Sequence, residues 1–90
     1  MKKHIIIIGK VQGVGFRYWL HKAAMQKNIT GWVRNKLSGE VEALLIGNDE
    51  EIIRIIKLCK KGPFSSEVTK ISVQNYEQEY SKKSFEIINT

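Results

Sequence analysis

Residues 5–17 of the chain read IIIIGKVQGVGFR, and this stretch decides the fold around it. Four consecutive β-branched isoleucines predict a buried central strand. From Phe16 to about Asn28 the apolar residues recur at helical spacing, which predicts a helix with one apolar face. The glycine-rich run between these two segments predicts a tight connection from the strand into the helix.

The glycine run also has the composition of an anion-binding loop. Glycine has no Cβ, so backbone N–H groups can approach an anion closely, and a following helix N-terminus adds positive potential. Arg17, which closes the run, supplies a planar fork of donors that matches phosphate oxygens. A cation is disfavoured at a helix N-terminus, which favours a functional reason for this arginine. The residues therefore predict a small oxyanion cradle, with phosphate as the leading ligand.

Downstream of this helix, the pattern of apolar residues predicts further strands. Segments 31–37 and 40–46 form the arms of an expected hairpin, with residues 38–39 (Ser-Gly) at its turn. Apolar residues within 68–73 support a fourth strand, and those within 85–88 support a short last one.

A second helix is expected between the hairpin and the fourth strand. Asn48 is a suitable N-cap, Glu51 follows it at the spacing of a capping box, and Gly62-Pro63 ends the helix. The resulting order is βαββαβ, with a possible extra short C-terminal strand. It predicts an α+β, ferredoxin-like sandwich, in which an antiparallel sheet carries two helices on one face.

Length, charge and cysteine content narrow the class of protein. Ninety residues predict a single domain, residues 1–90. The net charge of +6 favours anionic partners but does not choose between nucleic acid and small phosphorylated molecules. Cys59 is the only cysteine, which excludes an intramolecular disulfide and favours a cytoplasmic setting. No apolar run approaches the roughly twenty residues that cross a bilayer, so we expect no membrane partner.

Two segments together resemble the two signature segments of the acylphosphatase family. They are GKVQGVGFR at residues 9–17 and GWVRNKLSGEVEALLIG at residues 31–47, and the resemblance extends over the whole chain. It implies a hydrolase (EC 3.6.1.7) that splits the carboxyl–phosphate bond of acyl phosphates, and a monomer is expected because that is the default for so small a domain. The products are a carboxylate and inorganic phosphate, which is expected to inhibit competitively. No metal, organic cofactor or nucleic acid is expected.

The resemblance also assigns roles to individual residues. Arg17 is expected to bind the phosphoryl group, and Asn35 to position the attacking water. An amide cannot act as a general base, but its carbonyl oxygen can fix a water molecule. The loop backbone is expected to wrap the phosphate, through Val11, Gln12, Gly13, Val14, Gly15 and Phe16.

The sequence leaves other assignments of function and of individual residues open. His21, one helical turn after Arg17, is an alternative general base. His4 and Arg34 are expected to face solvent. The same fold and charge also suit a single-stranded RNA-binding module, although its aromatic signature run is absent. A basic interaction domain without catalysis, such as a sensor of acyl phosphates, is the third reading.

Overall fold

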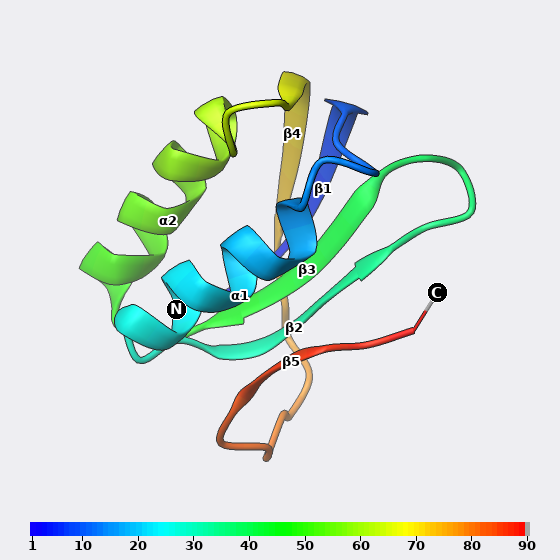
Figure 1. Cartoon of the computed structure of the whole chain (residues 1–90). Coiled ribbons are helices and arrows are strands. Elements are labelled where there is room, and N and C mark those ends of the chain that lie inside the picture. The colour runs from blue at the N-terminus through cyan, green and yellow to red at the C-terminus, as the bar shows by residue number, and fades with distance from the viewer. Residues whose placement is uncertain (90) are drawn as a thin grey trace.

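The computed structural model describes residues 1–89 as a five-stranded sheet covered on one face by two helices (Figure 1). The elements are β1 (Lys2–Lys10), α1 (Phe16–Gln26), β2 (Thr30–Asn35), β3 (Val41–Ile46), α2 (Asp49–Lys61), β4 (Glu67–Asn75) and β5 (Phe85–Ile87). The strand order is β4-β1-β3-β2-β5, which confirms the expected ferredoxin-like α+β fold and its extra C-terminal strand.

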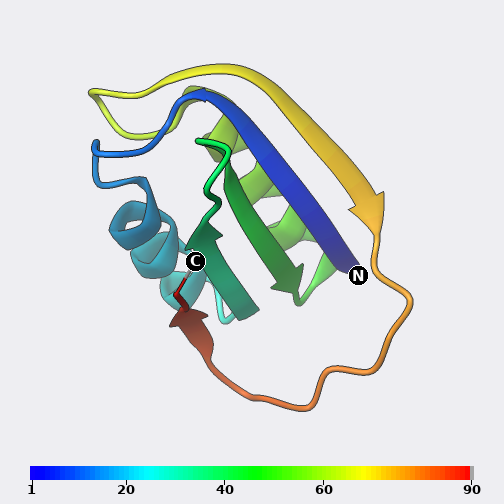
Figure 2. The ribbon, with the colours of Figure 1, turned by 90° about the vertical axis from the view of Figure 1, so that its right-hand side faces the viewer.

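All neighbouring strands are antiparallel except β2 and β5, which run parallel at one edge of the sheet. Because β4 and β5 lie at opposite edges of the sheet, residues 76–84 must cross from one edge to the other. Figure 2 shows this connection passing around one end of the sheet. Tyr80 ties it to the sheet by donating a hydrogen bond from its hydroxyl to the Gly31 carbonyl, at 3.3 Å.

The core lies between the sheet and the helices. Alternate residues of β1 are fully buried against the helices, because successive side chains of a strand point to opposite faces. This confirms the interior position of β1, although only Ile5 and Ile7 of its four isoleucines are fully buried. The other core residues are Val11, Phe16, Leu20, Ala24, Ile29, Val33, Val41, Ala43, Leu45, Ile52, Ile55, Cys59 and Phe85. No described helix is long and apolar enough to cross a membrane.

The ends of both helices show how local sequence sets their length. Helix α1 stops at Gln26 rather than Asn28, because Asn28 adopts a left-handed φ of 55° and the next amide turns back to the Ala24 carbonyl. In α2, Asn48 caps the helix as expected, since its side chain accepts a hydrogen bond from the Glu50 amide at 2.9 Å. The second half of the expected capping box is wrong, because the Glu51 carboxylate pairs with an arginine within α2 instead.

The hairpin turn is longer than the sequence predicts. Pairing between β2 and β3 ends at Asn35 and Val41, so the connection comprises residues 36–40 rather than two residues. The Gly39 amide donates to the Lys36 carbonyl at 3.1 Å, and the Lys36 amide donates to the Glu40 carbonyl at 2.8 Å. These bonds close a wider turn whose tip points outward.

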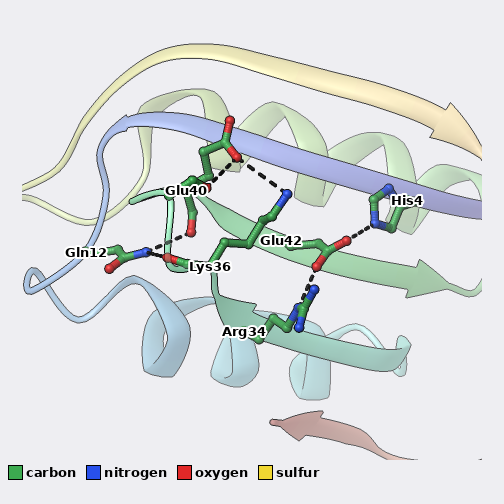
Figure 3. Close-up of polar contacts among 7 residues, drawn as sticks. His4, Gln12, Arg34, Lys36, Glu40 and Glu42 are labelled. Atoms are coloured by element: carbon green, nitrogen blue, oxygen red, sulfur yellow. Dashed lines mark hydrogen bonds and ion pairs between the residues drawn. The ribbon is translucent and has the colours of Figure 1, made fainter. Parts of the chain in front are cut away.

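The open face of the sheet carries a polar cluster that the sequence analysis missed. Glu42 accepts a hydrogen bond from Arg34 Nε at 2.5 Å, and its other oxygen lies 2.5 Å from His4 Nε2 (Figure 3). Trp32 packs edge-on against His4, with ring centroids 6.2 Å apart. His4 and Arg34 do lie on the open face, as expected, but neighbouring strands bring both to one carboxylate, so their side chains are only 25% and 35% exposed.

This cluster gives a pH-dependent contribution to stability. Burial opposes ionisation of Glu42, but hydrogen bonds from Arg34 and His4 outweigh it and lower its pKa below 4.5. A carboxyl group whose pKa is lower in the folded protein than in the unfolded chain stabilises the fold fully at pH values above its unfolded-state pKa. That stabilisation is lost as the pH falls through the folded-state pKa. The contribution of Glu42 is therefore complete at neutral pH and declines in acid.

We expect Glu42→Gln to lower the free energy of unfolding by about 1–3 kcal/mol at neutral pH, because charged hydrogen bonds to a side chain only 12% exposed are lost. The difference from wild type should shrink as the pH falls through the lowered folded-state pKa of Glu42, because the wild-type carboxyl then also gains a proton. Urea unfolding of both proteins across this range measures it. A difference that stays constant with pH would contradict the assignment.

Candidate active site

The two residues expected to do the chemistry line one small cavity. It has a volume of about 100 Å³ and lies at the N-terminus of α1. Arg17 comes from the first turn of α1, whereas Asn35 is the last residue of β2. The lining residues are Val11, Gly13, Gly15, Phe16, Arg17, Tyr18 and Asn35. The fold thus brings together residues from both signature segments.

The loop before α1 contains two glycines in the left-handed region of backbone conformation. Gly13 and Gly15 have φ values of 73° and 78°, a region that costs other residues roughly 1–2 kcal/mol. Gly15 is also the N-cap of α1, so no side chain caps the helix, and its first turn holds no acidic residue. The amide groups that start the helix are therefore left without a side-chain acceptor, and they give this end of α1, whose first residues line the cavity, a positive potential.

Arg17 carries a charge that no carboxylate neutralises within residues 1–89. Arg34 and Arg54 each pair with a glutamate, but Arg17 takes part in none of the ion pairs between described residues. Arg17 is a half-buried residue of the first turn of α1 and lines the cavity. The positive charge of Arg17 and the positive end of the α1 dipole therefore lie together without a neutralising carboxylate, which suits a bound anion.

Asn35 lies on the same face of β2 as the buried Val33, because side chains alternate along a strand. Its neighbour Arg34 points to the opposite face, where it binds Glu42. The Asn35 side chain makes no hydrogen bond to another described side chain or backbone group. Its amide is therefore available to a water molecule or a ligand in the cavity.

The other residues of the predicted cradle differ in where their side chains lie. Val11 and Phe16 are buried and anchor the loop at both ends, while Val14 packs against the core. The side chain of Gln12 does not line the cavity and binds the hairpin turn instead. Tyr18 also lines the cavity, although the residue is 69% exposed, and the sequence analysis did not predict it. Its position next to Arg17 is the sequence feature that could have indicated this placement.

His21 is not among the residues around this cavity. It lines a separate hollow of about 420 Å³ between α1 and β5, where its ring lies 6.1 Å from that of Phe85. This position does not support a role as general base. Burial raises the pKa of Cys59 to about 12, which disfavours a nucleophilic thiolate.

The described residues offer neither a metal-binding cluster nor a stacking surface for RNA bases. Among the described residues, no group of three or more His, Cys, Asp or Glu side chains could hold a metal ion. The central strands β1 and β3 contain no Phe, Tyr or Trp, so the open face lacks the paired stacking aromatics of RNA-binding sheets.

Comparisons with known proteins show the family of the chain. The model of the Acylphosphatase family matches residues 3–87. An acylphosphatase of Rhodopseudomonas palustris (strain BisB5) is 36% identical over 93 residues, which cover 98% of this chain and 94% of that protein. An acylphosphatase of Moorella thermoacetica is 37% identical over 87 residues, covering 97% and 92%. The crystal structure of an acylphosphatase from Bacillus subtilis matches with a TM-score of 0.92 and 36% identity over 97% of each chain. The chain therefore belongs to the acylphosphatase family of hydrolases.

Proposed function

We propose that the enzyme hydrolyses acyl phosphates by in-line attack of a water molecule on a phosphoryl group held at the N-terminus of α1. The observation that carries this proposal is the shared cavity of Arg17 and Asn35. Arg17 holds the phosphoryl oxygens with its planar fork of donors. Backbone amides of residues 11–16 bind the remaining oxygens, as in other phosphate-binding loops that lead into a helix.

Asn35 supplies the second half of the mechanism by orienting the water. Its carbonyl oxygen accepts a hydrogen bond from the water, whose oxygen then faces the phosphorus opposite the leaving carboxylate. The water oxygen forms the new bond to phosphorus, and the bond from phosphorus to the acyl oxygen breaks. The water proton passes to a phosphoryl oxygen of the substrate. A carboxylate leaves readily, so positioning and charge stabilisation suffice.

The size of the cavity bears on substrate choice. A volume of about 100 Å³ suits a phosphoryl group, which leaves the acyl portion outside, beside the exposed ring of Tyr18. We therefore propose broad tolerance for the acyl group. We also propose that residues 1–90 act as one monomeric domain in the cytoplasm.

Hydrolysis of benzoyl phosphate by the purified protein tests the function. We expect turnover that inorganic phosphate inhibits competitively, because the product occupies the same cradle as the phosphoryl group. The disappearance of substrate at several phosphate concentrations measures both effects. Phosphate that leaves the rate unchanged, or lowers kcat without changing the apparent KM, would contradict an anion held by the loop and Arg17.

A further inference from the structure

Gln12 lies within the glycine loop, yet its side chain is turned toward the hairpin and not into the cavity. Its amide nitrogen Nε2 donates hydrogen bonds to the carbonyl of Lys36 at 2.7 Å and to that of Glu40 at 2.9 Å (Figure 3). Both hydrogens of this nitrogen are used. One side chain thus joins the phosphate loop to the turn between β2 and β3.

The two carbonyls that Gln12 binds lie at the base of that turn. Lys36 follows Asn35 directly, and Glu40 precedes Val41, the residue that pairs with Asn35 across the hairpin. Gln12 therefore holds the hairpin where the ladder ends, one residue beyond Asn35. The exposed tip of the turn lies outside this contact, since Leu37 is 97% exposed.

The pairing of β2 shows why such a contact matters for Asn35. On its outer side β2 pairs with β5 only from Gly31 to Val33. At Asn35, within the described residues, β3 is the only strand beside it. The end of β2 is thus held by β3 from one side and by Gln12 at the turn.

We propose that Gln12 is a positioning residue that fixes the hairpin against the phosphate loop, so that the Asn35 amide faces the bound phosphoryl group. This inference rests on the proposed function. Gln12 touches neither the phosphoryl group nor the water through its side chain. It sets the distance between the element that binds phosphate and the element that orients water.

Gln12→Glu tests the proposal at nearly constant side-chain size. An ionised carboxylate has no donor for either carbonyl and repels both, so the hairpin should move away from the loop. We expect kcat for benzoyl phosphate to fall about 10–100-fold, because small misplacements of reacting groups are costly. In Gln12→Ala, which adds no negative charge beside the cradle, the inhibition constant of phosphate should change by less than about threefold, since Arg17 and the loop amides still bind the anion.

Gln26→Glu is the matched control, because it adds the same charge at an exposed position at the far end of α1. Gln12→Ala removes the donors without adding charge and should lower kcat in the same direction. In an Asn35→Ala background, Gln12→Glu should lower kcat by less than about threefold, because Gln12 acts through Asn35. Circular dichroism confirms that each variant is folded before its kinetics are measured.

Three results would overturn the positioning role. One is an unchanged kcat in both Gln12 variants. Another is a phosphate inhibition constant that, in Gln12→Ala, rises as much as kcat falls, which would place Gln12 in the anion cradle itself. The third is a full additional loss in the Asn35→Ala background. Equal rates for wild type and Arg17→Ala would instead contradict the proposed function, so the two failures are distinguishable.

Discussion

Arg17→Ala is expected to lower kcat/KM for benzoyl phosphate by about 10³–10⁵-fold, the range for an arginine that stabilises a transferring phosphoryl group. The loss should appear in kcat and in KM, because Arg17 is the cavity's guanidinium and no described carboxylate shares its charge. Inhibition by inorganic phosphate should weaken in parallel. Steady-state kinetics with and without phosphate measure all three quantities.

Stability separates this role from a structural one. A cation in the first turn of a helix opposes the helix dipole, so Arg17→Ala should leave the free energy of unfolding unchanged or raise it by about 0.3–1 kcal/mol. Arg54→Ala removes the same charge from the exposed face of α2 and should keep full activity. Arg17→Lys keeps the charge but loses the planar fork, so its activity should lie between those of wild type and Arg17→Ala. An inactive Arg17→Ala that also unfolds more easily would contradict the assignment.

The order of elements could be predicted from sequence because local signals and long-range packing agree in most of the chain. The isoleucine run, the N-cap at Asn48 and the helix end at Gly62 each specify structure within a few residues of sequence. The fold then follows from their order, since a strand and helix pattern of this kind has few ways to bury its apolar faces.

Contacts between distant segments could not be predicted in the same way. The sequence identified Gln12 as part of a loop but held no local sign that its amide reaches residues 24 and 28 positions away. The pairing of His4 and Arg34 with Glu42 likewise depends on the register of three strands. Such side chains appear solvated until the sheet is assembled, which is why the open-face cluster was missed.

Asn35→Ala is expected to lower kcat by about 10²–10³-fold, comparable to the loss of one group that acts on the transition state. The inhibition constant of phosphate should stay nearly constant, because Arg17 and the loop amides bind the anion without Asn35. Turnover and phosphate inhibition of the variant, measured together, separate these effects. If phosphate inhibition weakened by the same factor as kcat falls, Asn35 would bind phosphate and would not orient water.

Asn35→Asp sharpens this distinction because it changes charge while keeping an acceptor oxygen. A carboxylate can still hold the water, but its charge repels the bound phosphoryl group, so phosphate inhibition should weaken where Asn35→Ala leaves it intact. Among the described residues that line the cavity there is no His, Asp or Glu, so no imidazole or carboxylate is at hand to activate the water in place of the amide that orients it. Raising the pH should therefore not rescue Asn35→Ala. Such a rescue would show that a titrating group activates the water, and Asn35 would then have a different role.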